Sequence, residues 1–183
     1  MLKNEELMTA SLDSFREISV YGHERYYGGR SDSFRLVDYA SGELTLLTVI
    51  GSVRSGSYAK YLLKAPELTI GKQYLIMADY GLTCPLDYGL VVRTAEFDQK
   101  YTYQGDDLGA VQEPDYLRLA LWAPTASEVM VSFFHEGKTS RVPLKRYEKG
   151  VWRAILPGNY DGYGYTYLVK VNGGRMALQT PFS

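Results

Sequence analysis

Residues 103–126 read YQGDDLGAVQEPDYLRLALWAPTA, and this stretch decides how the chain divides. Its second half alternates leucines with other residues: Leu117, Arg118, Leu119, Ala120, Leu121 and Trp122. This period of two residues is typical of a β-strand that buries one face. Pro124 ends the strand because its nitrogen has no hydrogen to donate to a neighbouring strand. One unit closes and another opens in this part of the chain, and we place the boundary near Asp98.

Further strand patterns lie on both sides of this stretch, each bounded by residues that favour turns. Before it they are 16–21, 33–39, 43–50, 58–65, 73–78 and 88–94, with loops at 22–33 and 79–87. After it they are 129–134, 141–146, 151–156, 163–171 and 176–180. Residues 5–15 instead place Met8, Leu12 and Phe15 at spacings of four and three, which predicts at most a short helix.

These patterns predict an all-β protein. We expect two small immunoglobulin-like antiparallel β-sandwich domains in tandem, at residues 1–97 and 98–183. A chain of 183 residues is long enough for two domains of this size, each with its own core. No linker of distinct composition separates them, so we expect a tight join.

The charge balance argues against strongly charged partners. Twenty Lys and Arg residues against twenty-one Asp and Glu residues leave a net charge of −1, so nucleic acid and an anionic membrane are not the expected partners. The chain has 17 tyrosines. A tyrosine ring offers an apolar face with a hydroxyl at its edge, which matches the C–H face and hydroxyl rim of a sugar. The same residue is also a common strand residue, which is the plainer explanation.

Few residues are suited to metal binding or nucleophilic catalysis. Cys84 is the only cysteine, so we expect no internal disulfide and a buried structural thiol. His23 and His135 lie far from it and from each other, which argues against a zinc site, and no cofactor is expected. The first residues lack the apolar run of a signal peptide and no stretch is long enough to span a membrane, so we expect a cytoplasmic protein.

Carboxylates cluster within residues 103–126, at Asp106, Asp107, Glu113 and Asp115. Glycoside hydrolysis needs two carboxylates at a fixed separation, one of them with a raised pKa. These four lie in the segment before a strand, where Asp usually forms turns and caps, and nothing in the sequence separates their pKa values. We therefore assign no catalytic residue.

The sequence of the same stretch resembles that of a known family. GDDLGA at 105–110 and LWAPTASEV at 121–129 resemble the start of a carbohydrate-binding module of family 48 in type I pullulanases, debranching enzymes of glycoside hydrolase family 13. Upstream, IGKQY at 70–74 and YGLVVRTAEFD at 88–98 are similar to the end of the N-terminal domain of these enzymes. That domain type is classed as carbohydrate-binding module family 68 and is associated with malto-oligosaccharides.

The resemblance implies a non-catalytic, α-glucan-binding and scaffolding region in front of a catalytic barrel that this chain lacks. In the family the catalytic carboxylates lie in that barrel, which would hydrolyse the α-1,6 branches of pullulan, starch or glycogen. The expected partners are therefore an α-glucan, such as a malto-oligosaccharide, pullulan or glycogen, and the barrel of the same parent chain. The alternative is a pair of purely structural domains that pack on the barrel without binding sugar.

For the first unit, the candidate sugar-contacting residues are tyrosines: Tyr21, Tyr26, Tyr27, Tyr80 and Tyr88. The second unit departs from the pattern of tightly binding family 48 modules, which carry two loop tryptophans and a lysine between them. Here the loops read HEGK at 135–138 and Arg175-Met176, and Leu168 occupies the place of the lysine. Trp122 and Trp152 are expected to be structural or interface aromatics.

Overall fold

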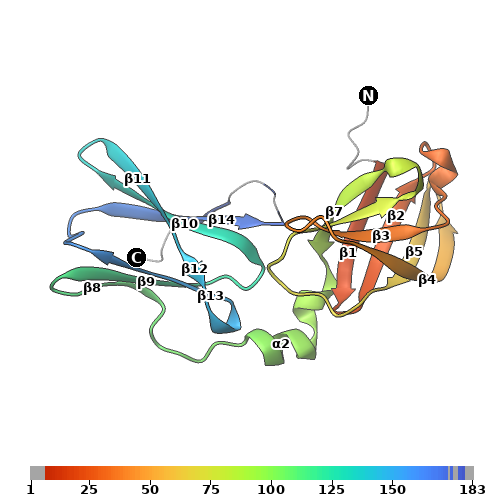
Figure 1. Cartoon of the computed structure of the whole chain (residues 1–183). Helices are drawn as coiled ribbons and strands as arrows, with labels where there is room; N and C mark the ends of the chain where they lie inside the picture. Colours follow the sequence, from red (N-terminus) through yellow and green to blue (C-terminus); the bar gives the residue numbers. More distant parts are fainter. Residues whose placement is uncertain (1–6, 173, 175–176, 180–183) are drawn as a thin grey trace. The chain divides into compact units, whose positions relative to one another are not determined.

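The computed structural model describes residues 7–172, 174 and 177–179. The chain forms two compact units, Met1–Asp98 and Gln99–Ser183, and both are built of β-strands (Figure 1). The all-β prediction is therefore confirmed. None of the helices in the described part is long and apolar enough to cross a lipid bilayer.

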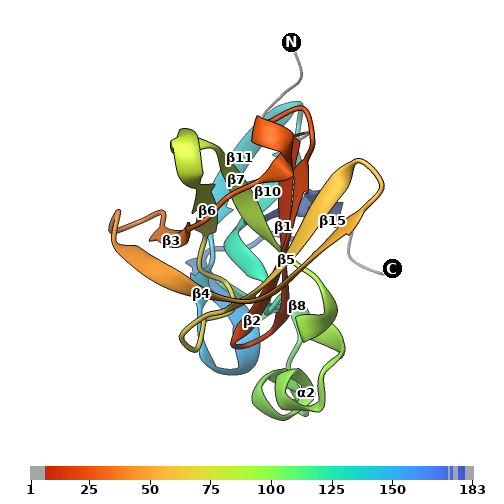
Figure 2. The same ribbon diagram turned by 90° about the vertical axis from the view of Figure 1, so that its right-hand side faces the viewer.

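The first unit is a closed barrel of seven strands (Figures 1 and 2). Neighbouring strands follow the order β1-β2-β5-β4-β3-β6-β7, and β1 pairs in parallel with β7, for example at Ala10 and Leu86. The strands are β1 (Met8–Ser14), β2 (Glu17–His23), β3 (Phe34–Asp38), β4 (Leu44–Ser55), β5 (Tyr58–Lys64), β6 (Tyr74–Ala78) and β7 (Thr83–Tyr88).

The sandwich predicted for residues 1–97 is wrong, because the first unit is a closed barrel. Two segments that were not expected to be strands close the sheet on itself. The predicted helix around Met8 is strand β1, in which Met8, Ala10 and Leu12 point inward. The predicted loop 79–87 contains all of β7 except its last residue, Tyr88, while residues 90–93 of the predicted strand 88–94 form a 3₁₀ turn. A closed barrel has no exposed edge strand.

Alternate residues of these strands fill the barrel. Phe34, Ile18, Leu63 and Ile76 are almost completely buried. Cys84 is also buried, and desolvation raises the pKa of its thiol to about 12, with a smaller contribution from Asp87. The thiol therefore stays protonated at neutral pH and behaves as a small apolar core residue.

The second unit contains two four-stranded sheets, ordered β11-β10-β14-β15 and β12-β13-β9-β8. Strand β9 (Tyr116–Trp122) is the strand predicted from the leucine alternation. The remaining strands are β8 (Gly109–Gln112), β10 (Ala126–His135), β11 (Lys138–Pro143), β12 (Lys145–Arg146), β13 (Val151–Pro157), β14 (Gly164–Val171) and β15 (Ala177–Gln179). Among the described residues, all strand pairings in this unit are antiparallel.

One core joins the two sheets, with Leu119 and Trp152 from one sheet and Val129, Val131 and Tyr167 from the other. The unit is thus a two-layer sandwich, and its immunoglobulin-like topology stays a prediction. Short helical segments connect strands in both units: η1 (Tyr27–Gly29), η2 (Asp79–Gly81), η3 (Leu90–Arg93), α2 (Ala95–Tyr101) and η4 (Glu148–Gly150). The side chain of Thr94 caps α2 by accepting the amide hydrogen of Phe97 (3.2 Å).

One core residue carries an unsatisfied polar atom. The Tyr167 hydroxyl is buried without a hydrogen-bond partner in the described structure, and desolvation raises its pKa. We expect Tyr167→Phe to raise the free energy of unfolding by about 1 kcal/mol, because it removes a desolvated hydroxyl that gains nothing. Urea unfolding followed by tryptophan fluorescence measures this.

The matched control is Tyr61→Phe in the barrel. The Tyr61 hydroxyl donates to the Gly29 carbonyl (3.0 Å) and accepts the Ser31 amide hydrogen (3.2 Å). Its loss should lower the free energy of unfolding by about 1–2 kcal/mol, as followed by circular dichroism. A Tyr167→Phe protein less stable than the parent would show that the hydroxyl has a partner after all.

Candidate functional site

Three of the candidate tyrosines meet at one place on the first unit. Tyr27, at the start of η1, stacks on Tyr80 of η2 with ring centroids 3.9 Å apart and planes inclined by 17°. Tyr26 meets Tyr27 edge-on at 4.8 Å. We call Tyr26, Tyr27 and Tyr80 the tyrosine cluster. Tyr27 and Tyr80 are 59% and 68% exposed, so parts of both rings face solvent.

The backbone at this cluster is unusual. Tyr27 and Tyr80 both have positive φ, 48° and 66°, in the left-handed region that bulky residues avoid. Each such residue costs on the order of 1–3 kcal/mol, and residues of this kind gather at functional sites. Both tyrosines precede a glycine, in YGG at 27–29 and DYG at 79–81. The two Tyr-Gly pairs are visible in the sequence, but only the fold shows that the two turns adjoin.

Hydrogen bonds join the two turns. The carboxylate of Asp79 accepts the amide hydrogens of Asp32 (2.6 Å) and Ser33 (3.1 Å) and the Ser33 hydroxyl hydrogen (2.6 Å). These bonds, above all the one from the Ser33 hydroxyl, lower the pKa of Asp79. The Tyr26 hydroxyl donates to the carbonyl of Tyr80 (3.1 Å). The position of Tyr80 against Tyr27 is therefore fixed from both sides.

The strand face beneath adds further contacts to the loop that carries Tyr27. The guanidinium of Arg54 donates to the Gly28 carbonyl (2.6 Å), and the Tyr61 hydroxyl bridges Gly29 and Ser31. Burial, followed by Tyr27 and Tyr80, raises the pKa of Tyr26, so its hydroxyl remains a donor at neutral pH. A loop held in this way loses little further conformational freedom when a ligand binds.

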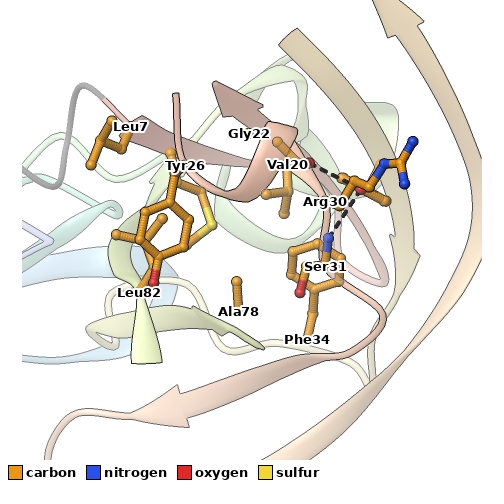
Figure 3. Close-up of a pocket in the computed structure, with 12 residues that line it drawn as sticks. Leu7, Val20, Gly22, Tyr26, Arg30, Ser31, Phe34, Ala78 and Leu82 are labelled. Atoms are coloured by element: carbon orange, nitrogen blue, oxygen red, sulfur yellow. Dashed lines mark hydrogen bonds between the residues drawn. The ribbon is translucent and has the colours of Figure 1, made fainter. Parts of the chain in front are cut away.

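A small cavity lies beside the cluster at the end of the barrel (Figure 3). Its walls are mostly apolar and include Leu7, Met8, Val20, Tyr26, Phe34 and Leu82. The space inside amounts to about 10 Å³, which is close to the lower limit for one water molecule. A sugar ring cannot enter, so a saccharide at this place must lie on the exposed rings.

The other two candidate tyrosines lie apart from the cluster. Tyr21 is on the outer face of β2, with the Lys60 ammonium 5.5 Å from its ring centroid. Tyr88, at the end of β7, accepts the amide hydrogen of Gly71 on its hydroxyl (2.7 Å) and so braces a turn. Sequence reasoning missed the residues that position the cluster, Asp79, Arg54 and Tyr61, because their partners are distant in sequence.

The two tryptophans have different environments. Trp152 lies in the core, and its indole N–H donates to the Ala123 carbonyl (3.0 Å). Trp122 is 42% exposed. Its indole N–H is shared between the carbonyls of Tyr101 (2.9 Å) and Lys149 (3.1 Å). Trp122 therefore helps to fasten the segment before β8 to strand β9 of the same unit.

We call residues 99–107 the strap. The Lys149 ammonium donates to the Gln99 carbonyl (3.0 Å), and the guanidinium of Arg153 donates to the Tyr103 hydroxyl (2.8 Å) and to the Asp107 carboxylate. The Tyr103 hydroxyl in turn donates to Asp107. A Cβ at Gly105 would lie 2.3 Å from the Tyr103 hydroxyl oxygen, so only glycine leaves room for this arrangement.

The strap explains one member of the carboxylate cluster seen in the sequence, Asp107. Hydrogen bonds from Tyr103 and then Arg153 lower the pKa of Asp107 to about 2. A catalytic acid would need the opposite shift. Among the described residues, no group of three or more His, Cys, Asp or Glu side chains is placed to hold a metal ion.

His135, in the loop of the second unit that departs from the family pattern, stacks on Tyr163 before β14. The rings of His135 and Tyr163 are 4.1 Å apart and inclined by 9°. Leu168 is buried. Arg175 and Met176, at the other end of that predicted surface, lie outside the described residues.

A known protein family matches each of the two units. Residues 9–93 match the family described as pullulanase N1-terminal domain, and residues 107–182 match carbohydrate-binding module 48, the isoamylase N-terminal domain. A pullulanase of Bacillus subtilis (strain 168) is 36% identical over 106 residues, covering 57% of this chain and 15% of the relative. A 1,4-alpha-glucan branching enzyme GlgB of Bacillus caldolyticus is 34% identical over 64 residues, covering 34% of this chain and 10% of the relative.

Two solved structures are similar over most of the chain. The pullulanase of Anoxybacillus sp. LM18-11 complexed with maltotriose has a TM-score of 0.85 at 30% identity, covering 92% of this chain and 24% of that protein. Type I pullulanase of Bacillus subtilis str. 168 complexed with maltose has a TM-score of 0.85 at 28% identity, covering 94% and 24%. The chain thus spans about a quarter of these relatives, 24% in each case.

The strap should make the second unit sensitive to acid. The folded pKa of Asp107 lies below its ordinary value of 3.8, so its contribution to stability is present above about pH 4 and is lost as the pH falls through about 2. Both tryptophans lie in this unit, so urea unfolding followed by tryptophan fluorescence from pH 7 to pH 2 reports on it alone.

Asp107→Asn should flatten the acid limb of this profile and lower stability at neutral pH. The control is Asp106→Asn, at the exposed neighbouring position, which should keep the parent profile. An acid limb of unchanged slope in Asp107→Asn would contradict the assignment of this group.

Proposed function

We propose that this chain is the α-glucan-binding and scaffolding region of a pullulanase, because its two parts match a pullulanase N1-terminal domain and a family 48 carbohydrate-binding module. In this proposal the parent enzyme hydrolyses α-1,6-glucosidic branches of pullulan, starch or glycogen in a separate catalytic barrel. The partners are the α-glucan and that barrel. The cytoplasmic location stays a prediction.

The observation that carries the proposal is the exposed stack of Tyr27 on Tyr80. Each ring can present an apolar face to the C–H face of a glucose unit, and the hydroxyls at the ring edges can exchange hydrogen bonds with sugar hydroxyls. The strained backbone and the hydrogen bonds to Asp79 hold the rings in place before a ligand arrives. Such a shallow surface buries little area, so we expect a Kd weaker than about 1 μM.

We propose that this chain by itself does not hydrolyse glucan. The carboxylate of Asp107 is bound by Tyr103 and Arg153, and its pKa is lowered to about 2, which opposes a role as a general acid. The positions of the catalytic residues in the parent enzyme follow from the family resemblance and belong to the proposal.

A second candidate function is packing on the catalytic barrel without sugar binding. A row of apolar side chains crosses four strands on the outer face of the first unit: Leu44, Val37, Leu75 and Pro85. Leu46, beside this row on β4, is 69% exposed. An exposed apolar patch of this kind favours contact with another protein surface, so the two functions are compatible.

Replacing tyrosine by glycine separates binding from folding. In Tyr80→Gly the stacking ring is lost, while glycine adopts the φ of 66° without strain. We therefore expect stability equal to or above that of the parent and a Kd for pullulan or glycogen raised by about fivefold or more, the equivalent of roughly 1 kcal/mol. Affinity electrophoresis of the full chain in polysaccharide gels gives the Kd, and thermal unfolding gives the stability.

Tyr39→Ala is the matched control, because Tyr39 is an exposed tyrosine of the same unit outside the tyrosine cluster. It should migrate like the parent. If the parent itself is not retarded at high polysaccharide concentration, the binding function is wrong and the scaffolding function remains.

A further inference from the structure

Tyr21 shares the outer face of the barrel with two other aromatic side chains. His23 follows it on β2, and Tyr58 lies directly opposite His23 on β5. The His23 and Tyr58 rings meet edge-on, with centroids 4.9 Å apart and planes inclined by 84°. Tyr58 is 42% exposed and Tyr21 is 37% exposed. We call Tyr21, His23 and Tyr58 the outer-face aromatics.

The pleat of the two strands explains why these rings share a face. Gly22 and Ala59 form the intervening pair, and Ala59 points into the barrel core, where it is buried. Val20 and Tyr61, the pair on the other side of Tyr21, are buried in the same core. Lys60, opposite Tyr21, reaches its ammonium over the Tyr21 ring. The face thus combines flat rings with a donor that carries three N–H groups.

Hydrogen bonds connect this face to the tyrosine cluster. The Glu24 amide donates to the Ser57 carbonyl (2.8 Å), which joins the end of β2 to the turn before Tyr58. Arg54 reaches from the same β4–β5 hairpin to the Gly28 carbonyl. The six steps of chain from Tyr21 to Tyr27 span at most about 22 Å even when fully extended. One oligosaccharide of several glucose units is long enough to cover both places.

We propose that the outer-face aromatics are a second stacking subsite for the same α-glucan that the tyrosine cluster binds. This inference rests on the proposed glucan-binding function and adds a preference for chain length. A short saccharide occupies the tyrosine cluster alone, whereas a longer one also lies along Tyr58 and Tyr21, with Lys60 donating to its hydroxyls. The ligand is a neutral polyhydroxylated chain because the face offers rings and hydrogen-bond donors without a concentration of one charge.

The test is isothermal titration calorimetry of the full chain with maltotriose and with maltoheptaose. The parent should bind maltoheptaose about fivefold or more tightly than maltotriose, the factor expected for one added ring contact. Tyr58→Leu keeps an apolar cross-strand side chain but removes the ring. It should reduce the preference for maltoheptaose to less than about twofold and leave the maltotriose Kd unchanged within about twofold.

Tyr21→Leu should act in the same direction, and Tyr39→Ala should keep the parent preference. Tyr80→Gly should weaken the binding of both sugars. Circular dichroism of each variant establishes that the barrel is folded.

The outcomes separate this inference from the function on which it rests. If the parent binds and Tyr58→Leu and Tyr21→Leu both keep the full preference for maltoheptaose, the outer-face aromatics only stabilise the sheet, and the subsite is refuted while the binding function stands. Equal affinity of the parent for the two sugars, or an equal loss for both in Tyr58→Leu, also refutes it. If the parent binds neither sugar nor polysaccharide, the binding function itself fails.

Discussion

The carboxylate of Asp79 is the interaction on which the candidate site depends. It lies immediately after the last residue of β6, where Ala78 pairs with Phe34 at the start of β3. It accepts hydrogen bonds from Asp32 and Ser33, which precede β3, so one side chain joins two segments 46 residues or more apart in sequence. The two turns that carry Tyr27 and Tyr80 meet because the strand register brings their ends together and this carboxylate secures the junction.

The fold could be predicted where the pattern had one interpretation. The leucines of β9 alternate over six residues, and no helical spacing fits them. Met8 and Leu12 are four residues apart, a spacing that both a strand and a helix allow, and Ala10 between them is too small to mark the buried face in the sequence. That ambiguity concealed the strand that closes the barrel. The choice between sandwich and barrel depends on the pairing of β1 with β7, a contact between segments more than 70 residues apart.

The candidate site could be predicted in its residue type but not in its geometry. Abundant loop tyrosines pointed to Tyr26, Tyr27 and Tyr80, yet their association requires left-handed backbone at two of them and hydrogen bonds from distant residues. Tyr88 has the same side chain and braces a turn instead. The acidic run at 106–107 drew attention as possible chemistry, whereas Asp107 is an anchor for the strap.

The strap bears on how the second unit could be moved between proteins. Its match to the carbohydrate-binding family begins at residue 107. However, the indole N–H of Trp122 donates to the Tyr101 carbonyl, and the guanidinium of Arg153 donates to the Tyr103 hydroxyl. A fusion partner joined at the family boundary would leave those donors facing solvent or the foreign sequence. A domain transferred intact to another protein should therefore begin at Gln99, so that it includes the strap.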